Sequence, residues 1–499
     1  MQFKTPANAA LYLRKDHVMD NKQTTTIDWS SVQQPVPEWF QDAKFGLFFH
    51  WGPYSVPACQ NEWYSRNMYC KGLEQNRYHE EHFGSLHDFG YKDFIPMMKG
   101  EAFDPEEWAD LVEKSGARYA GPVTEHADNF SMWDSNVNPI NSVNCGPHRD
   151  VFGECAKAFR EHDIKLIATF HHQWLWGWFM STDNEADVYE PKNEIYYGPA
   201  LPLETNRYLP YRYPDDKFNT TWRDKVFEVI DKYSPDAIYF DSRTCIIGES
   251  YRYQIADYYY HTTGHKDGII TYKQEDFPLG IGVYDLELGH FASPKPFVWQ
   301  SDDRLEDNVT WCIVQNPKYK SAAKIIQQLC DIVSKNGNLL LNVGPQADGS
   351  FHPEAKRQLY AVGDWLKVNG EAIYGSRPFT IAAEGPAAQK DENFDIDKLH
   401  EQIKNGDAAD VRGNALGEHD FRFTTNNGFL YAIAMGWPAD GTLKVQTLRT
   451  NGALSHIESV SLLGCEEPLS WEQTDTTLVV QMPKTPPCDH AFVLKIPME

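Results

Sequence analysis

A carboxylate stands at the end of a short apolar segment near the middle of the chain. Residues 237–240 (AIYF) are apolar, and Asp241 follows them directly. A short apolar run bounded by polar residues is typical of a strand buried on both faces. In a barrel of alternating strands and helices, catalytic side chains lie where such strands end. Asp241 is therefore a candidate catalytic residue, although an aspartate at this place can also simply begin a loop.

Polar side chains also follow four other strand-like segments. The residues at these ends are His50 and Trp51, Glu125 and His126, His171 and His172, and Gln274 and Glu275. Because the carboxyl ends of parallel strands meet at one mouth of a barrel, we expect these residues to share a site with Asp241.

Two kinds of chemistry fit such a mouth. Three histidines (His50, His126 and His171) together with Asp241 could bind zinc or manganese. Neutral imidazoles also hydrogen-bond hydroxyl groups, and tryptophan faces stack on the C–H faces of sugars. The histidines are interleaved with tryptophans, namely Trp51, Trp63, Trp133, Trp174 and Trp176. This pattern favours a carbohydrate site over a metal site.

Cleavage of a sugar requires two carboxyl groups that flank the scissile bond. Asp241 is the expected nucleophile, with Arg243 close enough in sequence to favour its ionised form. Glu287 stands between two leucines, an apolar setting typical of a proton-donating acid. Glu275 lies at a strand end, which favours its reach into the mouth. The residues alone leave both glutamates open as the acid/base, and either could be a surface carboxylate.

Strand-like and helix-like segments alternate between residues 44 and 368. This alternation predicts parallel strands in a (β/α)8-like TIM barrel, although not every strand is visible in the sequence. Strands are expected at 44–51, 117–124, 164–170, 236–240, 268–272 and 338–343. Helices are expected at 105–115, 151–162, 221–233, 251–261, 320–334 and 353–368.

The pattern changes after the barrel. Short alternating segments follow residue 385, which is typical of a small antiparallel β-sandwich. We therefore predict an N-terminal arm (1–35), a catalytic barrel (36–378) and a C-terminal sandwich (379–499). Residues 387–413 are polar and are expected to form an irregular insertion.

The composition excludes several classes of partner. The formal net charge is −25, which argues against nucleic acid and anionic membranes. The nine cysteines include no pair at metal-binding spacing, and no apolar run is long enough to span a bilayer. No signal peptide is visible at the N-terminus, so we expect either a cytoplasmic protein or a processed periplasmic or secreted form.

Several long motifs resemble a known family. Residues 43–58 (AKFGLFFHWGPYSVPA) and the following Asn61-Glu62-Trp63-Tyr64 resemble the opening of the α-L-fucosidases, glycoside hydrolase family 29. Residues 334–345 (SKNGNLLLNVGP) and 370–375 (GEAIYG) are similar to later motifs of that family. The resemblance covers roughly residues 36–378, and the C-terminal region fits it loosely.

The resemblance implies a retaining exo-glycoside hydrolase that releases terminal α-linked L-fucose from oligosaccharides or polysaccharides, without metal or cofactor. It implies Asp241 as the nucleophile and Glu287 as the acid/base, with Glu275 as the alternative. The implied sugar-binding residues are His50, Glu62, Trp63, His126 and one of His171 and His172. Trp51, Trp133 and Arg243 complete the expected site.

One departure from the family pattern concerns substrate fit. Where the family has a second histidine after His126, this chain has Ala127. The smaller side chain suggests that a substituted fucose or L-galactose could be accepted. Two alternatives remain: a carbohydrate-binding protein that has lost catalysis, and a metal-dependent hydrolase. Homo-oligomerisation is left open.

Overall fold

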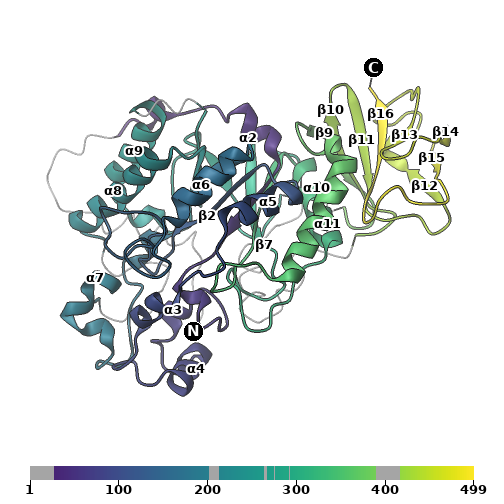
Figure 1. Cartoon of the computed structure of the whole chain (residues 1–499). Coiled ribbons are helices and arrows are strands. Elements are labelled where there is room, and N and C mark those ends of the chain that lie inside the picture. Colours follow the sequence, from purple (N-terminus) through teal and green to yellow (C-terminus); the bar gives the residue numbers. More distant parts are fainter. Residues whose placement is uncertain are drawn as a thin grey trace.

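The structure is a computed structural model that describes residues 27–201, 213–262, 267–274, 276–291, 293–388 and 416–498. Figure 1 shows a barrel surrounded by helices and, beside α10 and α11, a smaller domain of β-strands at the C-terminal end. Among the described residues, no helix is both long enough and apolar enough to cross a membrane.

The barrel contains eight parallel strands in chain order, and β8 closes onto β1. The predicted (β/α)8 barrel is therefore confirmed. The strands are β1 (Phe45–Phe49), β2 (Tyr119–Glu125), β3 (Lys165–Phe170), β4 (Ala237–Phe240), β5 (Ile269–Lys273), β6 (Val283–Asp285), β7 (Trp299–Arg304) and β8 (Gly337–Asn342).

Two strands escaped sequence-based prediction for physical reasons. The strand β6 has only three residues, fewer than an alternating pattern needs to be visible. The strand β7 (WQSDDR) is fully buried although most of its residues are polar, so it has no apolar run. Its inward-facing polar side chains, Gln300 and Asp302, have their partners inside the barrel, as described below.

The surrounding helices begin at clear caps. The Asp104 carboxylate accepts a hydrogen bond from the Glu106 amide, and Asp215 does the same for Phe218. The latter cap starts α8 five residues before the predicted position. The α-helices are α2 (Glu38–Ala43), α3 (Tyr64–Asn67), α4 (Glu74–His82), α5 (Pro105–Ser115), α6 (Val151–Glu161), α7 (Glu194–Tyr197), α8 (Asp216–Tyr233), α9 (Glu249–Asp257), α10 (Ala322–Ser334) and α11 (Pro353–Asn369).

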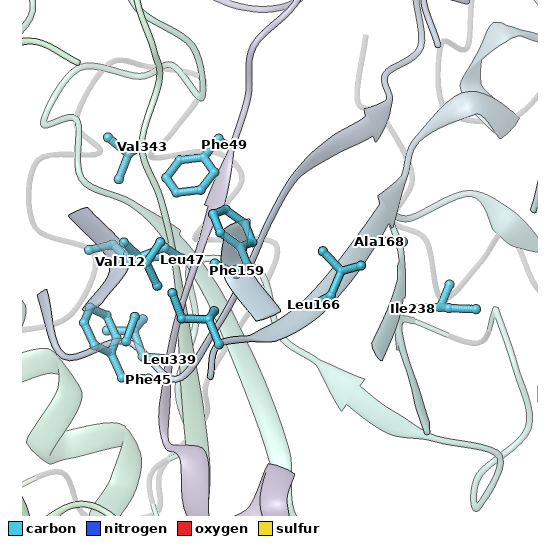
Figure 2. Packing of buried hydrophobic residues seen from close by; sticks show 14 of the residues in the cluster. Phe45, Leu47, Phe49, Val112, Phe159, Leu166, Ala168, Ile238, Leu339 and Val343 are labelled. Atoms are coloured by element: carbon cyan, nitrogen blue, oxygen red, sulfur yellow. The ribbon is translucent and has the colours of Figure 1, made fainter. Parts of the chain in front are cut away.

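Alternation along each strand divides the barrel into two apolar layers. In β1, Phe45, Leu47 and Phe49 face outward and pack against the helices, for example against Val112 of α5 (Figure 2). Phe48 belongs instead to the cluster that fills the barrel interior. A side chain at a strand end therefore points into the mouth only if it shares the parity of the interior residues.

The C-terminal domain consists of two antiparallel sheets, as predicted for the sandwich. The first has the strand order β13-β16-β11-β10-β9 and the second has the order β12-β15-β14. The strands are β9 (Arg377–Glu384), β10 (Phe421–Asn426), β11 (Phe429–Ala434), β12 (Thr442–Val445), β13 (Ser461–Leu462), β14 (Ser470–Gln473), β15 (Leu478–Gln481) and β16 (Phe492–Pro497). The predicted insertion lies almost entirely outside the described residues.

This domain and the N-terminal segment both pack on the barrel. The indole of Trp365 in α11 donates to the Ala491 carbonyl at 2.8 Å, and Gln327 of α10 donates to the Met435 carbonyl at 3.1 Å. Near the N-terminus, the Trp29 indole donates to Glu249 of α9 at 2.8 Å. The sandwich therefore rests on the two helices that precede it.

Candidate active site

Three histidines from β1, β2 and β3 meet at the mouth of the barrel. The imidazole rings of His50, His126 and His171 have centroids 5.0–5.5 Å apart. The inward direction of two of them follows from the alternation of side chains along a strand. His50 has the parity of the inward-facing Phe48, and His171 has the parity of the inward-facing Ile167.

A β-bulge brings His126 to the same face. Val123 pairs with Thr169, but Glu125 pairs with Phe170, so β2 carries one extra residue against β3. The extra residue reverses the parity, and Glu125 consequently points outward to Lys225 of α8, at 2.6 Å. His126, the next residue, points inward. Glu125 therefore does not join the mouth as the sequence suggested.

The three imidazoles are uncharged near neutral pH. Burial lowers the pKa of His50 to about 4, and burial holds the pKa of His126 and His171 well below the ordinary value. Each neutral ring offers one hydrogen-bond donor and one acceptor, which matches the hydroxyl groups of a sugar.

His50 is oriented by the last barrel strand. The side-chain oxygen of Asn342, at the end of β8, lies 2.7 Å from Nδ1 of His50 and accepts from its backbone amide at 3.1 Å. The Asn342 amide donates in turn to the Trp311 carbonyl. Since this contact engages Nδ1, the other nitrogen of His50 remains for a ligand.

Glu62 lies against the same group. Its Oε2 accepts from the Trp311 amide at 2.9 Å, and the Trp311 ring lies 5.6 Å from that of His50. Burial raises the pKa of Glu62 to about 7. Next in the chain, Trp63 packs on Trp178 and Trp174, with ring centroids 4.7 and 5.5 Å away. Glu62 therefore lies beside His50 through Trp311, and Trp63 lies against Trp178, whose ring centroid is 6.1 Å from that of His126.

Asp241 follows β4 and is held from two sides. Its Oδ2 accepts from the Trp174 indole at 2.7 Å, and its Oδ1 lies 3.1 Å from Nζ of Lys273. Arg243 supports Trp174: its guanidinium lies over the indole at 4.9 Å and donates to the Trp174 carbonyl at 3.3 Å. The Asp241 side chain is 14% exposed, which leaves it accessible to a small ligand.

Lys273, the last residue of β5, was not predicted. Its Nζ contacts Asp241, Glu287 at 2.8 Å and Asp302 at 3.0 Å. Burial alone would lower the pKa of Lys273, but the surrounding carboxylates outweigh it and hold this pKa well above the ordinary value. One buried ammonium group therefore ties together three carboxyl groups from β4, β7 and the turn after β6.

The shared lysine sets a limit on the distance between the two candidate catalytic groups. Asp241 Oδ1 and Glu287 Oε2 lie 3.1 and 2.8 Å from the same nitrogen. They cannot be farther apart than the sum of these distances, about 5.9 Å. The predicted apolar setting of Glu287 is wrong. Its side chain is 43% exposed and paired with Lys273, while the neighbouring Leu286 and Leu288 are buried. Glu275 lies outside the described residues.

A polar layer inside the barrel lies beneath this lysine. Asp302 hydrogen-bonds Asp285, which accepts from Gln300 at 2.6 Å; Gln300 in turn accepts from the Tyr119 hydroxyl at 2.9 Å. Burial raises the pKa of both aspartates, and the charge of Asp285 raises the pKa of Asp302 further. This layer explains why β7 is both polar and buried.

Comparisons with known proteins identify the family of the chain. A model of the α-L-fucosidase family matches residues 12–371, and a model of the α-L-fucosidase C-terminal domain matches residues 414–497. The chain belongs to the α-L-fucosidase family. Membership in this family makes it a glycoside hydrolase.

Named relatives match most of the chain. The tissue α-L-fucosidases of Rattus norvegicus and Homo sapiens are each 28% identical to it, over 94% of this chain and 92% and 91% of theirs. The crystal structure of Thermotoga maritima α-fucosidase in complex with fucose is 26% identical, covers 94% of this chain and 99% of its own, and superposes with a TM-score of 0.71.

Three residues expected in the fucosidase site lie elsewhere. Trp51 has the outward parity of Phe49 and packs against Trp108, 5.5 Å away. The Trp133 indole donates to Glu228 of α8 at 3.0 Å. His172 has the outward parity of Phe170 and lies 3.1 Å from the Trp222 carbonyl, so His171 rather than His172 joins the cluster.

The histidine cluster could also hold a metal ion. One ligand atom from each of His50, His126 and His171 lies within 4.8 Å of the others. Metal-bound histidines usually donate their second ring nitrogen to an acceptor. Within the part of the chain that the structure describes, only His50 has such a partner, because the Nδ1 atoms of His126 and His171 are buried without one there. The donor set therefore suits sugar hydroxyls better than a cation.

Proposed function

We propose that this enzyme releases terminal α-linked L-fucose from glycans with retention of configuration. The observation that carries the proposal is the link of Asp241 and Glu287 through one lysine. The two oxygens that contact this lysine are at most about 5.9 Å apart. This maximum is close to the carboxyl separation of roughly 5–5.5 Å in retaining glycosidases and below the roughly 6.5–9.5 Å of inverting ones.

The two carboxyl groups have separate roles in this mechanism. Asp241 attacks the anomeric carbon and forms the bond to the sugar as the glycosidic bond breaks. Glu287 gives a proton to the departing oxygen. Glu287 then accepts a proton from water, which attacks the same carbon and releases both fucose and Asp241.

The remaining site residues would hold the sugar. His50, His126 and His171 are neutral, and together with Glu62 they would hydrogen-bond its hydroxyl groups. The Trp63 ring would contact its apolar face. The solved complex of the Thermotoga maritima relative with fucose supports this choice of ligand.

Product stereochemistry and azide trapping test the mechanism. Proton NMR should detect α-L-fucose as the first product of an aryl α-L-fucoside. With azide, Asp241→Gly should yield the β-fucosyl azide and Glu287→Ala the α-fucosyl azide, because azide replaces the nucleophile in one variant and water in the other.

Controls assign the residues. Glu80→Ala changes an exposed carboxylate of α4 and should keep the native rate. Glu275→Ala is compared directly with Glu287→Ala: trapping of the α-azide only by the Glu275 variant would transfer the acid/base role to Glu275. A β-configured first product would overturn retention altogether.

We also propose that L-galactose-like substrates are accepted. Ala127 adjoins His126 and has a smaller side chain than the histidine typical of the family. It is 1% exposed and packs in one cluster with Tyr54 and Trp178. Rates on aryl α-L-galactoside and aryl α-L-fucoside, measured for the native enzyme and Ala127→His, test this. The histidine variant should lose the galactoside selectively; an equal loss on both substrates contradicts it.

A further inference from the structure

We infer that the C-terminal sandwich positions the proton donor, through a buried chain of side chains from Arg422 to Asp331 to His290. This inference rests on the proposed role of Glu287. It makes Arg422, Asp331 and His290 positioning residues, which hold the turn that carries Glu287 without touching the substrate.

The turn between β6 and β7 needs such support. Leu288 has a positive φ of 53°, a left-handed conformation that a leucine rarely adopts. A Cβ on the next residue, Gly289, would lie 2.6 Å from a side-chain carbon of Leu286, so the turn closes tightly. Strained backbone of this kind persists only where neighbouring contacts fix it.

Part of that support comes from β7. The Leu288 amide donates to the Asp302 carbonyl at 2.9 Å, and the Ser301 hydroxyl donates to the Leu286 and Gly289 carbonyls at 3.1 and 2.7 Å. These bonds fix the backbone from one side. They leave the far end of the turn, at His290, to another anchor.

His290 supplies that anchor three residues after Glu287. Its Nδ1 lies 2.5 Å from Oδ2 of Asp331, in the last turn of α10. The side chains of His290 and Asp331 are only 10% and 8% exposed, so water competes little for this contact. The turn is thereby tied to a helix on the outside of the barrel.

The sandwich reaches the same aspartate. Nε of Arg422, in β10, donates to Oδ1 of Asp331 at 2.5 Å, and Nζ of Lys335 lies 2.8 Å from Oδ2. Burial alone would raise the pKa of Asp331, but Lys335, Arg422 and His290 outweigh burial and hold this pKa well below its ordinary value. Asp331 is therefore a fixed anion that joins the sandwich to the turn.

Leaving-group dependence separates positioning from general damage. The fluoride ion departs from α-L-fucosyl fluoride without being protonated. The phenoxide of phenyl α-L-fucoside is a poorer leaving group and needs a proton from the enzyme to depart readily. His290→Phe should lower kcat/KM for the phenyl fucoside about tenfold or more, which is part of the roughly 10²–10⁴-fold that acid–base catalysis contributes in full. The kcat/KM of His290→Phe for α-L-fucosyl fluoride should stay within about twofold of the native value.

Two further variants extend the test along the chain of contacts. Arg422→Met should shift the ratio of the two rates in the same direction, because it frees Asp331 from the sandwich. His290→Asn, whose amide nitrogen can take the place of Nδ1, should restore much of the phenyl fucoside rate. The matched control is Arg377→Met, which removes another barrel–sandwich ion pair, to Asp42 at 2.8 Å, and should leave the ratio unchanged.

Each outcome decides a separate question. Equal losses on both substrates, or no loss, in folded His290→Phe and Arg422→Met would overturn the inference; if circular dichroism finds His290→Phe unfolded, Arg422→Met decides alone. Glu287→Ala must itself show a steep preference for the fluoride. If it does not, Glu287 is not the proton donor. If Glu287→Ala shows the preference but Arg422→Met leaves the ratio of the fluoride and phenyl fucoside rates unchanged, only the positioning chain is rejected.

Discussion

Glu62→Gln should stabilise the fold at alkaline pH while it damages the site. Burial raises the pKa of Glu62 from an ordinary 4.5 to about 7. Between these values the folded chain keeps a proton that the unfolded chain releases. The resulting stabilisation is fully present below about pH 4.5 and is lost as pH rises through 7. Glutamine is neutral throughout and does not carry this dependence.

The expected magnitude follows from the same pKa. For a shift from 4.5 to about 7, linkage gives a loss of about 2.5 kcal/mol between pH 5 and pH 8. The free energy of unfolding of Glu62→Gln, relative to the native chain, should therefore be about 2.5 kcal/mol higher at pH 8 than at pH 5. Urea unfolding followed by tryptophan fluorescence measures this difference.

Glu306→Gln is a matched control. Glu306 is fully buried, accepts from the Gly344 amide at 2.9 Å, and also has its pKa raised by burial to about 7. Both variants should gain stability at pH 8, but only Glu62→Gln should raise KM for an aryl fucoside. A stability difference that is equal at pH 5 and pH 8 would refute the reasoning that burial governs Glu62.

Three other substitutions probe the site. Lys273→Met leaves three carboxyl groups without their shared cation, so it should lower the free energy of urea unfolding by about 3–5 kcal/mol and abolish turnover of an aryl fucoside. Trp174→Phe removes the donor to Asp241 and should lower kcat about 10- to 100-fold, as expected for a hydrogen bond to a charged group. Asn342→Leu releases the ring of His50 and should raise KM about tenfold with little change in kcat.

Much of the barrel was readable because its outer and inner layers are apolar. Segments such as 164–170 and 338–343 are mostly apolar, and the structure places strands β3 and β8 there. The strand β7 was not readable, because its buried residues are satisfied by partners on other strands. Hydrogen-bond partners that are distant in sequence leave no local pattern.

The sequence predicted only part of the site, because it does not show directly which strand-end side chains face inward or which charged residue is buried. Placing a strand end identified His50 and His171, but the residues beside them, Trp51 and His172, face the outer layer. Counting from the interior residues Phe48 and Ile167 would have separated the two sets. The bulge that turns His126 inward has no such signal. Lys273 was passed over because a buried lysine is rare unless paired.

The two candidate catalytic carboxylates are held with unequal firmness. Asp241 follows β4, which pairs over four residues with each neighbour, whereas Glu287 follows β6, which pairs over three residues with β5 and two with β7. Local opening is easiest where backbone pairing is shortest. A loss of stability at the junction of barrel and sandwich should therefore displace Glu287 before Asp241. Proton donation would fail first, while attack by Asp241 on a substrate that needs no proton would persist.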